Sequence, residues 1–374
     1  MKKKISVVLA LALALVMVAG LAACGGTNPP ATSTPPAVST PPATGDSTPS
    51  PDATPEEPAL TTPLNFVFAH PYPASHHHNV GIIEPYIQEL MEKIPRLTIE
   101  LVAGGAISSG STVHDDVTFG SVDMMWAAQG SAPGRYPLTE MFEFPGHFGS
   151  GIEATKVMWD MLDNNEAFRA EYSNFVLFNL YTTEAGEIYS NKLIRTPADL
   201  AGVRLRSPSP MGERTMTAAG AVTMNMTMPD VYDNVDRGIV DGLATSPSAI
   251  PTYKLQEVVK FATNGMNLYV QPFMMAMSHT AWNQLSPAEQ AIVMEVGGRN
   301  ISYKSAELYD KLGGEAVDFL RDTITVSDLT EDEIAQWMAA MTPVIDTYIA
   351  GLEGRNIPAR DFYTQMISFR DALR

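Results

Sequence analysis

The chain has 374 residues, 45% of them hydrophobic, and its 42 acidic side chains against 24 basic ones give a formal net charge of −18. A surface this acidic is a poor partner for nucleic acid. The chain contains one cysteine, so it cannot form an internal disulfide, and the folded part must be stable without one.

The first residues are typical of a secretion signal. Three lysines precede an apolar run over 5–21, which ends in Leu-Ala-Ala-Cys at 21–24. This ending resembles the lipobox of bacterial lipoproteins, which implies that residues 1–23 are removed and that Cys24 becomes a lipidated N-terminus. A plain secretory signal with an incidental cysteine is the alternative. We expect an extracytoplasmic protein that a lipid anchors to the cell membrane.

Residues 24–63 consist mainly of proline, threonine, serine and alanine, with almost no large apolar side chain. Such a segment cannot bury a core and is typical of an extended, semi-rigid spacer. We interpret it as a tether that holds the folded part away from the membrane. The remaining residues, about 310, suffice for one large domain or two ordinary ones.

From residue 64 the chain alternates between strand and helix patterns. A helix over 79–95 with one apolar face lies between two strands, which predicts the βαβ unit of a parallel sheet. A short helix with a stop at Gly120 precedes the third strand. The strands predicted in this part cover 64–70, 97–105, 122–128, 174–183 and 187–192.

Residues 202–210 read Gly-Val-Arg-Leu-Arg-Ser-Pro-Ser-Pro and place Arg204 and Arg206 on one face of a short strand. A guanidinium at the end of a strand is well shaped to hold a planar carboxylate, so an anionic ligand is one interpretation. Two solvated surface arginines are the other.

The C-terminal part changes character towards long helices. A helix over 211–219, a strand over 221–227 and a helix over 229–240 still continue the α/β pattern. Capping-box sequences at 286–289 and 330–333 then open helical stretches that reach about residues 322 and 350. We expect a helical layer beside two sheets.

The sequence contains no catalytic-serine elbow, phosphate-binding loop or dinucleotide-binding motif, so we expect no enzyme. His76, His77 and His78 lie close to His70, but zinc sites need converging ligands and usually a carboxylate or thiol. We therefore expect no metal and no cofactor. A loop at a helix start, with His70 or His77 lining a pocket, is the favoured interpretation.

Methionines gather in three short stretches, at 124–125, 224–228 and 274–277. Most should fill the core. A few could line a cleft, because the first stretch leads into Trp126 and Phe273 directly precedes the third. Apolar walls with one fixed cation suit an organic acid that has a hydrophobic body.

Four stretches, in this order and spacing, resemble the solute-binding subunits of tripartite ATP-independent periplasmic (TRAP) transporters, and the resemblance runs from about residue 64 to 321. The four stretches are 122–145, 199–210, 226–250 and 274–293. The resemblance implies a two-lobed α/β periplasmic-binding-protein-like fold with hinge strands and long C-terminal helices. Such a protein closes on a small organic acid and hands it to an ion-gradient-driven membrane permease. We expect lobe I at 64–184 plus 273–315 and lobe II at 185–272 plus 316–374.

The resemblance also assigns individual positions. The arginine that pairs with the ligand carboxylate falls at Arg206, which leaves Arg204 as the solvated one. Positions that keep the family's pattern around the next helix are interpreted as structural. These positions are Asp230, Tyr232, Asp241 and Gly242.

Three positions depart from the family pattern. Met228 stands where an aromatic residue is frequent, Thr245 where an asparagine is frequent, and Gly186 where sialic-acid-type members carry a second arginine. These departures favour a monocarboxylate with an apolar or aromatic tail, although a dicarboxylate stays open.

The expected ligand-binding residues combine the arginine with apolar platforms and small polar donors. They are Arg206, Trp126, Gln129, Phe273, Thr245, Met228, Ser209 and His70. Trp126 and Phe273 could equally be core, and the polar residues could cap backbone instead. A sensor lipoprotein that signals to a membrane kinase or chemoreceptor is the alternative function. The sequence leaves the acid and the oligomeric state open.

Overall fold

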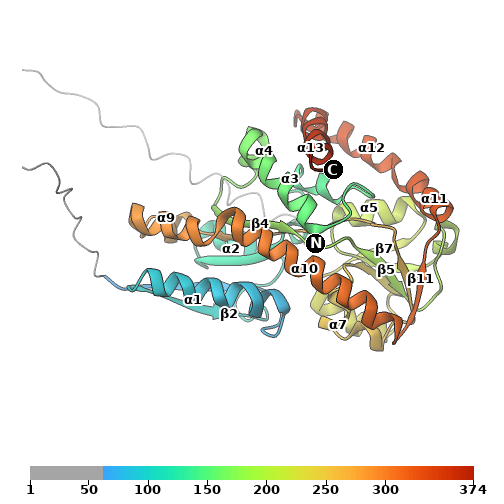
Figure 1. Ribbon diagram of the computed structural model, residues 1–374, viewed down its shortest axis with the longest axis horizontal. Coiled ribbons are helices and arrows are strands. Elements are labelled where there is room, and N and C mark those ends of the chain that lie inside the picture. The colour runs from blue at the N-terminus through green and yellow to red at the C-terminus, as the bar shows by residue number, and fades with distance from the viewer. Residues whose placement is uncertain (1–61) are drawn as a thin grey trace, which may run out of the picture. The chain divides into compact units, whose positions relative to one another are not determined.

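The computed structural model describes residues 62–374, and the predicted signal, Cys24 and most of the tether lie outside this part (Figure 1). The described residues form two β-sheets with helices around them, so the α/β prediction is confirmed. None of the helices in this part is long and apolar enough to cross a membrane.

The first sheet has five strands in the order β2-β1-β3-β10-β4. Its strands are β1 (Leu64–Ala69), β2 (Leu97–Val102), β3 (Met124–Ala128), β4 (Val176–Thr182) and β10 (Pro272–Met277). β1 runs parallel to β2 and β3, whereas β10 is antiparallel to β3 and β4. Helix α1 (Glu84–Lys93), preceded by a π-helical turn, connects β1 to β2, which confirms the predicted βαβ unit.

The second sheet has six strands in the order β11-β9-β5-β8-β6-β7. Its strands are β5 (Glu187–Ser190), β6 (Arg204–Ser207), β7 (Val222–Asn225), β8 (Gly242–Thr245), β9 (Phe261–Asn264) and β11 (Thr325–Asp328). β6 is parallel to both β7 and β8, so the carboxyl ends of these three strands meet at one edge of the sheet.

Two chain segments pass between the sheets side by side. Thr183 N donates to Gln271 O at 3.0 Å, and Gly186 N donates to Tyr269 O at 2.7 Å. These are the hinge strands that the resemblance implies. The long helix α10 (Gly298–Arg321) also contacts both sheets, packing on β4 and touching β11, and Figure 1 shows it extending from the first sheet to the second.

The long C-terminal helices are shorter than the sequence predicts. The stretch from Ser286 breaks into α9 (Pro287–Val296) and α10, because Gly298 adopts a left-handed φ of 67°. The stretch from Thr330 breaks at Pro343, because proline has no backbone N–H to donate to the preceding turn and its ring clashes with the carbonyl there. The capping boxes at Ser286 and Thr330 are both formed.

The other helices are α2 (Val113–Phe119), α3 (Gly151–Asn164), α4 (Glu166–Ala170), α5 (Pro210–Ala218), α6 (Val231–Asp236), α7 (Ala249–Thr252), α8 (His279–Trp282), α11 (Glu331–Met341), α12 (Pro343–Glu353) and α13 (Ala359–Leu373).

The two last helices pack on the first half of the molecule. Residues of α12 and α13, such as Ile349 and Phe362, share one hydrophobic core with Phe142 and with Met158 of α3. The lobe boundaries remain a prediction, but this packing groups α12 and α13 with α3, whereas the sequence prediction places 316–374 with the second lobe.

The second sheet is held at its centre by a structural ion pair and a glycine. Asp241 accepts from Arg204 N at 2.9 Å and pairs with the Arg204 guanidinium at 3.0 Å. A Cβ on Gly242 would lie 2.2 Å from the carbonyl oxygen of Tyr189 on β5. The structural interpretation of Asp241 and Gly242, and the solvated position of Arg204, are therefore confirmed.

A methyl group at residue 242 should force β5 and β8 apart. We expect Gly242→Ala to lower the free energy of unfolding by about 3 kcal/mol, because backbone must move to admit it. Gly351, exposed inside α12 with open space around its Cα, is the matched control, and Gly351→Ala should be stabilising by up to about 1 kcal/mol. Denaturant unfolding measures the free energy of unfolding of both variants. An equal change in the two would contradict the close approach of Gly242 to the β5 backbone.

A buried carboxyl fixes the start of α5. Ser209 caps this helix by accepting from Gly212 N at 3.0 Å, and its hydroxyl donates to a carboxyl oxygen of Glu143 in the short helix Thr139–Glu143. Burial raises the pKa of Glu143 to about 8, and the neighbouring Glu140 adds to the shift. The folded protein therefore retains a proton on Glu143 at neutral pH.

This proton links stability to pH. Between the ordinary carboxyl value of 4.5 and about 8, the unfolded chain releases the Glu143 proton while the folded chain keeps it, so stability falls as pH rises. We expect wild type to lose roughly 2 kcal/mol more than Glu143→Gln between about pH 6 and about pH 7.5. Unfolding titrations at both pH values test this, with Glu213→Gln, on the exposed face of α5, as control. Parallel pH profiles of wild type and Glu143→Gln would be inconsistent with a protonated Glu143.

Candidate functional site

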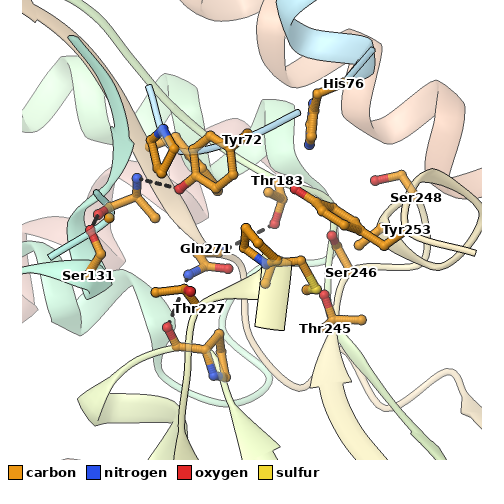
Figure 2. A pocket seen from close by; sticks show the side chains of 18 of the residues that line it. Tyr72, His76, Ser131, Thr183, Thr227, Thr245, Ser246, Ser248, Tyr253 and Gln271 are labelled. Carbon is orange, nitrogen blue, oxygen red and sulfur yellow. Dashed lines mark hydrogen bonds between the residues drawn. The ribbon is translucent and has the colours of Figure 1, made fainter. Parts of the chain in front are cut away.

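A cavity lies where the two sheets meet, beside the hinge strands. The first sheet contributes residues of the loop after β1 and the ends of β3 and β10, and the second contributes the carboxyl ends of β6, β7 and β8. Ligands of open α/β sheets bind at such strand ends. The cavity has a volume of about 70 Å³, and Figure 2 shows its polar side chains gathered around the space.

Arg206 is the cation of this cavity. It is only 3% exposed, and two backbone carbonyls fix its guanidinium: Nε donates to Met226 O at 3.0 Å and Nη1 donates to Ala244 O at 3.1 Å. A guanidinium has five N–H groups, so three remain, all on Nη1 and Nη2. This end of the fork matches the two oxygens of a carboxylate.

No acidic side chain within residues 62–374 forms an ion pair with Arg206. Burial lowers the pKa of the Arg206 guanidinium, but an arginine stays charged in proteins. A buried charge that lacks a counter-ion is costly. The site is therefore built to receive an anion.

Aromatic rings form the wall that the first sheet contributes. Tyr72 and Phe273 have ring centroids 5.8 Å apart, and Phe273 stacks on Tyr309 of α10 at 6.3 Å. Tyr72 is oriented by its hydroxyl, which accepts from Ala128 N at 3.2 Å. Tyr253 closes the wall from the other half of the molecule (Figure 2). The arrangement suits a flat apolar body.

Four of the eight expected residues line the cavity. Arg206 and Thr245 lie at the ends of β6 and β8, Phe273 lies on β10, and Met228 lies in the short helix that follows β7. Met226 joins Met228 there, whereas the methionines of β3 and β10 are fully buried in the core. The expectation that cleft methionines belong to the stretches beside Trp126 and Phe273 is therefore wrong, because those stretches are central strands of the first sheet, and the cleft methionines come from the stretch after β7.

The other four expected residues do not line the cavity. Trp126 is fully buried behind Tyr72, with ring centroids 4.4 Å apart, and donates its indole N–H to Tyr181. His70 is buried and donates from Nε2 to Asn79 Oδ1 at 2.8 Å. Both residues support the aromatic wall from behind.

Gln129 and Ser209 are buried beside the cavity. Gln129 Nε2 reaches the Tyr172 hydroxyl at 3.5 Å, and Ser209 is the cap of α5 described above. Backbone capping, the alternative interpretation of Ser209, is therefore the role that the structure shows.

Several lining residues were missing from the prediction. No local motif marks Tyr72 in the loop after β1, Tyr309 in the long helix α10 or Gln271 in the hinge strand. Their positions in the cavity depend on how these three elements meet. Tyr253, which directly follows α7, also has no local motif, and its place in the cavity depends on tertiary packing. His77 lines the cavity, as the interpretation of the histidine cluster allowed, and so does His76, whereas His70 does not line it.

Gly186 has no room for the second arginine. A Cβ at this position would lie 2.7 Å from the ring of Tyr269.

In the part of the chain that the structure describes, no group of three histidine, cysteine or acidic side chains is arranged to hold a metal ion.

The chain is similar to known solute-binding proteins. The profile of the family described as "Bacterial extracellular solute-binding protein, family 7" matches residues 68–351. The C4-dicarboxylate-binding periplasmic protein of Rhodobacter capsulatus is 28% identical over 173 residues, which are 46% of this chain and about half (51%) of that protein.

Solved structures share the fold at low identity. A TRAP solute-binding protein from a marine metagenome, specific for aromatic acid ligands and bound to meta-hydroxyphenylacetate, has a TM-score of 0.79 and 20% identity, covering 83% of this chain and 99% of that one. A TRAP periplasmic solute-binding protein of Bordetella bronchiseptica with bound mandelate has a TM-score of 0.77 and 18% identity, covering 83% of this chain and all (100%) of that one. The two-lobed α/β fold is therefore confirmed, and the chain belongs to family 7 of the bacterial extracellular solute-binding proteins.

Proposed function

We propose that this protein captures a monocarboxylate with an apolar, aromatic-sized body and delivers it to the membrane permease of a TRAP transporter. The observation that carries this proposal is Arg206, a buried cation with three free N–H groups and no acidic partner within residues 62–374. A ligand carboxylate supplies the missing charge, and exclusion of water strengthens the pair relative to an exposed one.

The walls favour one carboxylate rather than two. Among the described residues, Arg206 is the only lysine or arginine that lines the cavity, and the lining includes the aromatic rings of Tyr72, Phe273 and Tyr309. A second carboxylate would have to be buried without a cation, which is costly. The aromatic acids bound by the structural neighbours agree with this chemistry, whereas the Rhodobacter relative is named for dicarboxylates.

Delivery to a permease requires a location outside the cytoplasm. We propose that Cys24, at the end of the signal sequence, carries the lipid anchor and that residues 25–63 tether the binding domain to the membrane. The ligand then passes to permease subunits in the same membrane. The protein itself performs no chemistry on the ligand.

The Arg206 assignment is tested by binding. We expect benzoate, phenylacetate or a close relative to raise the thermal unfolding midpoint of protein refolded to remove carried ligand. Arg206→Ala should weaken binding by about a hundredfold or more, because a ligand charge is then buried without a partner. Arg204 lies two residues away and its side chain is exposed, so Arg204→Ala should leave the affinity for the acid within about threefold of the wild-type value.

Isothermal titration with both variants gives these ratios. Equal affinity of wild type and Arg206→Ala would contradict the proposal, as would the absence of binding by every aromatic monocarboxylate.

The lipid anchor has its own test. We expect the full chain expressed in a bacterium to sediment with membranes and Cys24→Ala to be released in soluble form. Mass spectrometry of the mature N-terminus should show an acylated Cys24. An unmodified N-terminus beyond residue 24 would contradict anchoring and leave the binding site unaffected.

A further inference from the structure

We propose that the cavity selects acids whose apolar body carries a hydroxyl group, and that His76, His77 and Tyr253 bind this hydroxyl. The inference rests on the proposed function, because it specifies the class of acid for the same cavity. We call these three residues the hydroxyl corner. They lie where the loop after β1 meets the segment after α7, so both halves of the molecule contribute.

The hydrogen bonds of His77 fix its tautomer. Its Nδ1 lies 3.2 Å from Thr252 Oγ1, and the Thr252 hydroxyl already donates to Ser248 O at 2.8 Å. A hydroxyl has one proton, so Thr252 accepts here and His77 Nδ1 carries the proton. Nε2 of His77 is then an acceptor, and this atom is buried without a hydrogen-bond partner among the described residues.

The hydrogen bonds of His76 fix the opposite tautomer. Its Nδ1 accepts from the backbone N–H of His78 at 3.2 Å, so in a neutral ring the proton lies on Nε2. Burial lowers the pKa of His76 well below its ordinary value and that of His77 to about 4, so both rings are neutral at neutral pH. Figure 2 shows the His76 ring and the Tyr253 ring reaching towards each other across the cavity wall.

The three rings are neighbours in the wall of the cavity. The ring centroids of His76 and His77 are 4.2 Å apart, and those of His76 and Tyr253 are 5.9 Å apart. The Tyr253 hydroxyl is also buried without a partner in residues 62–374. The corner thus presents a donor from His76, an acceptor from His77 and a tyrosine hydroxyl that can be either.

A hydroxyl oxygen fits this set because it donates once and accepts from other groups. It would donate to His77 Nε2 and accept from His76 Nε2–H or from Tyr253. A carboxylate in the same place would face the lone pair of His77 with no cation beside it. A ligand with an unsubstituted ring would leave polar atoms of the corner buried and unpaired, and this lowers its affinity relative to the hydroxylated acid.

The test compares matched ligands and variants by isothermal titration of the ligand-free protein. The ligands are benzoate, phenylacetate, their ring-hydroxylated isomers and the methoxy counterpart of the best isomer. We expect at least one hydroxylated isomer to bind about tenfold or more tighter than its parent. The methoxy counterpart, which accepts but cannot donate, should bind no tighter than the parent.

The variants locate the effect. Tyr253→Phe and His77→Leu should each reduce the gain from the hydroxyl, measured as the affinity ratio of the hydroxylated acid to its parent in the same variant, to less than about threefold. Tyr269→Phe is the matched control, since the Tyr269 hydroxyl is also buried and unpartnered in the described residues but does not line the cavity. It should retain the full gain.

The outcomes separate the two proposals. If parent acids bind in an Arg206-dependent way but no hydroxylated isomer binds tighter, the hydroxyl corner is overturned and the proposed function stands. A gain that persists in both Tyr253→Phe and His77→Leu also overturns the corner. If no acid binds through Arg206, both proposals fall together.

Discussion

The buried guanidinium of Arg206 is the constraint on which the site depends. Two backbone carbonyls orient it, and residues 62–374 supply no carboxylate to neutralise it. Because the charge is buried, an anion that binds beside it supplies the missing counter-charge. A ligand that binds only the folded protein then stabilises the native state by mass action.

The fold serves this constraint through its strand ends and crossings. Arg206 and Thr245 emerge from parallel neighbours in the second sheet, while Tyr72 and Phe273 come from the first. The hinge strands and α10 connect the halves, so the cation and most of the aromatic wall come from different halves of the molecule. Gly242 allows the close approach of β5 and β8 within the second sheet, and the Ser209–Glu143 contact joins the start of α5 to the short helix Thr139–Glu143.

The sequence predicted what depends on local pattern and on family motifs. The βαβ unit and the capping boxes follow from periodicity and spacing, and the structure confirms both. Arg206 follows from a family motif; the structure places it in the cavity, and its role as the ligand cation stays a prediction. Trp126 was expected in the cavity because methionines precede it, and His70 because it lies close to the histidine cluster. Both are buried behind Tyr72 instead, since alternation along a strand does not reveal which side a second aromatic layer fills. Tyr309 and Tyr253 meet the ligand space only through tertiary packing, so no local signal identifies them.

A crystal structure of the protein grown with benzoate tests the central claim most directly. The account predicts that both carboxylate oxygens accept hydrogen bonds from Nη1 and Nη2 of Arg206, with the ring against Tyr72 and Phe273. A benzoate bound elsewhere, or an Arg206 guanidinium that pairs with an acidic side chain of its own chain, would contradict it.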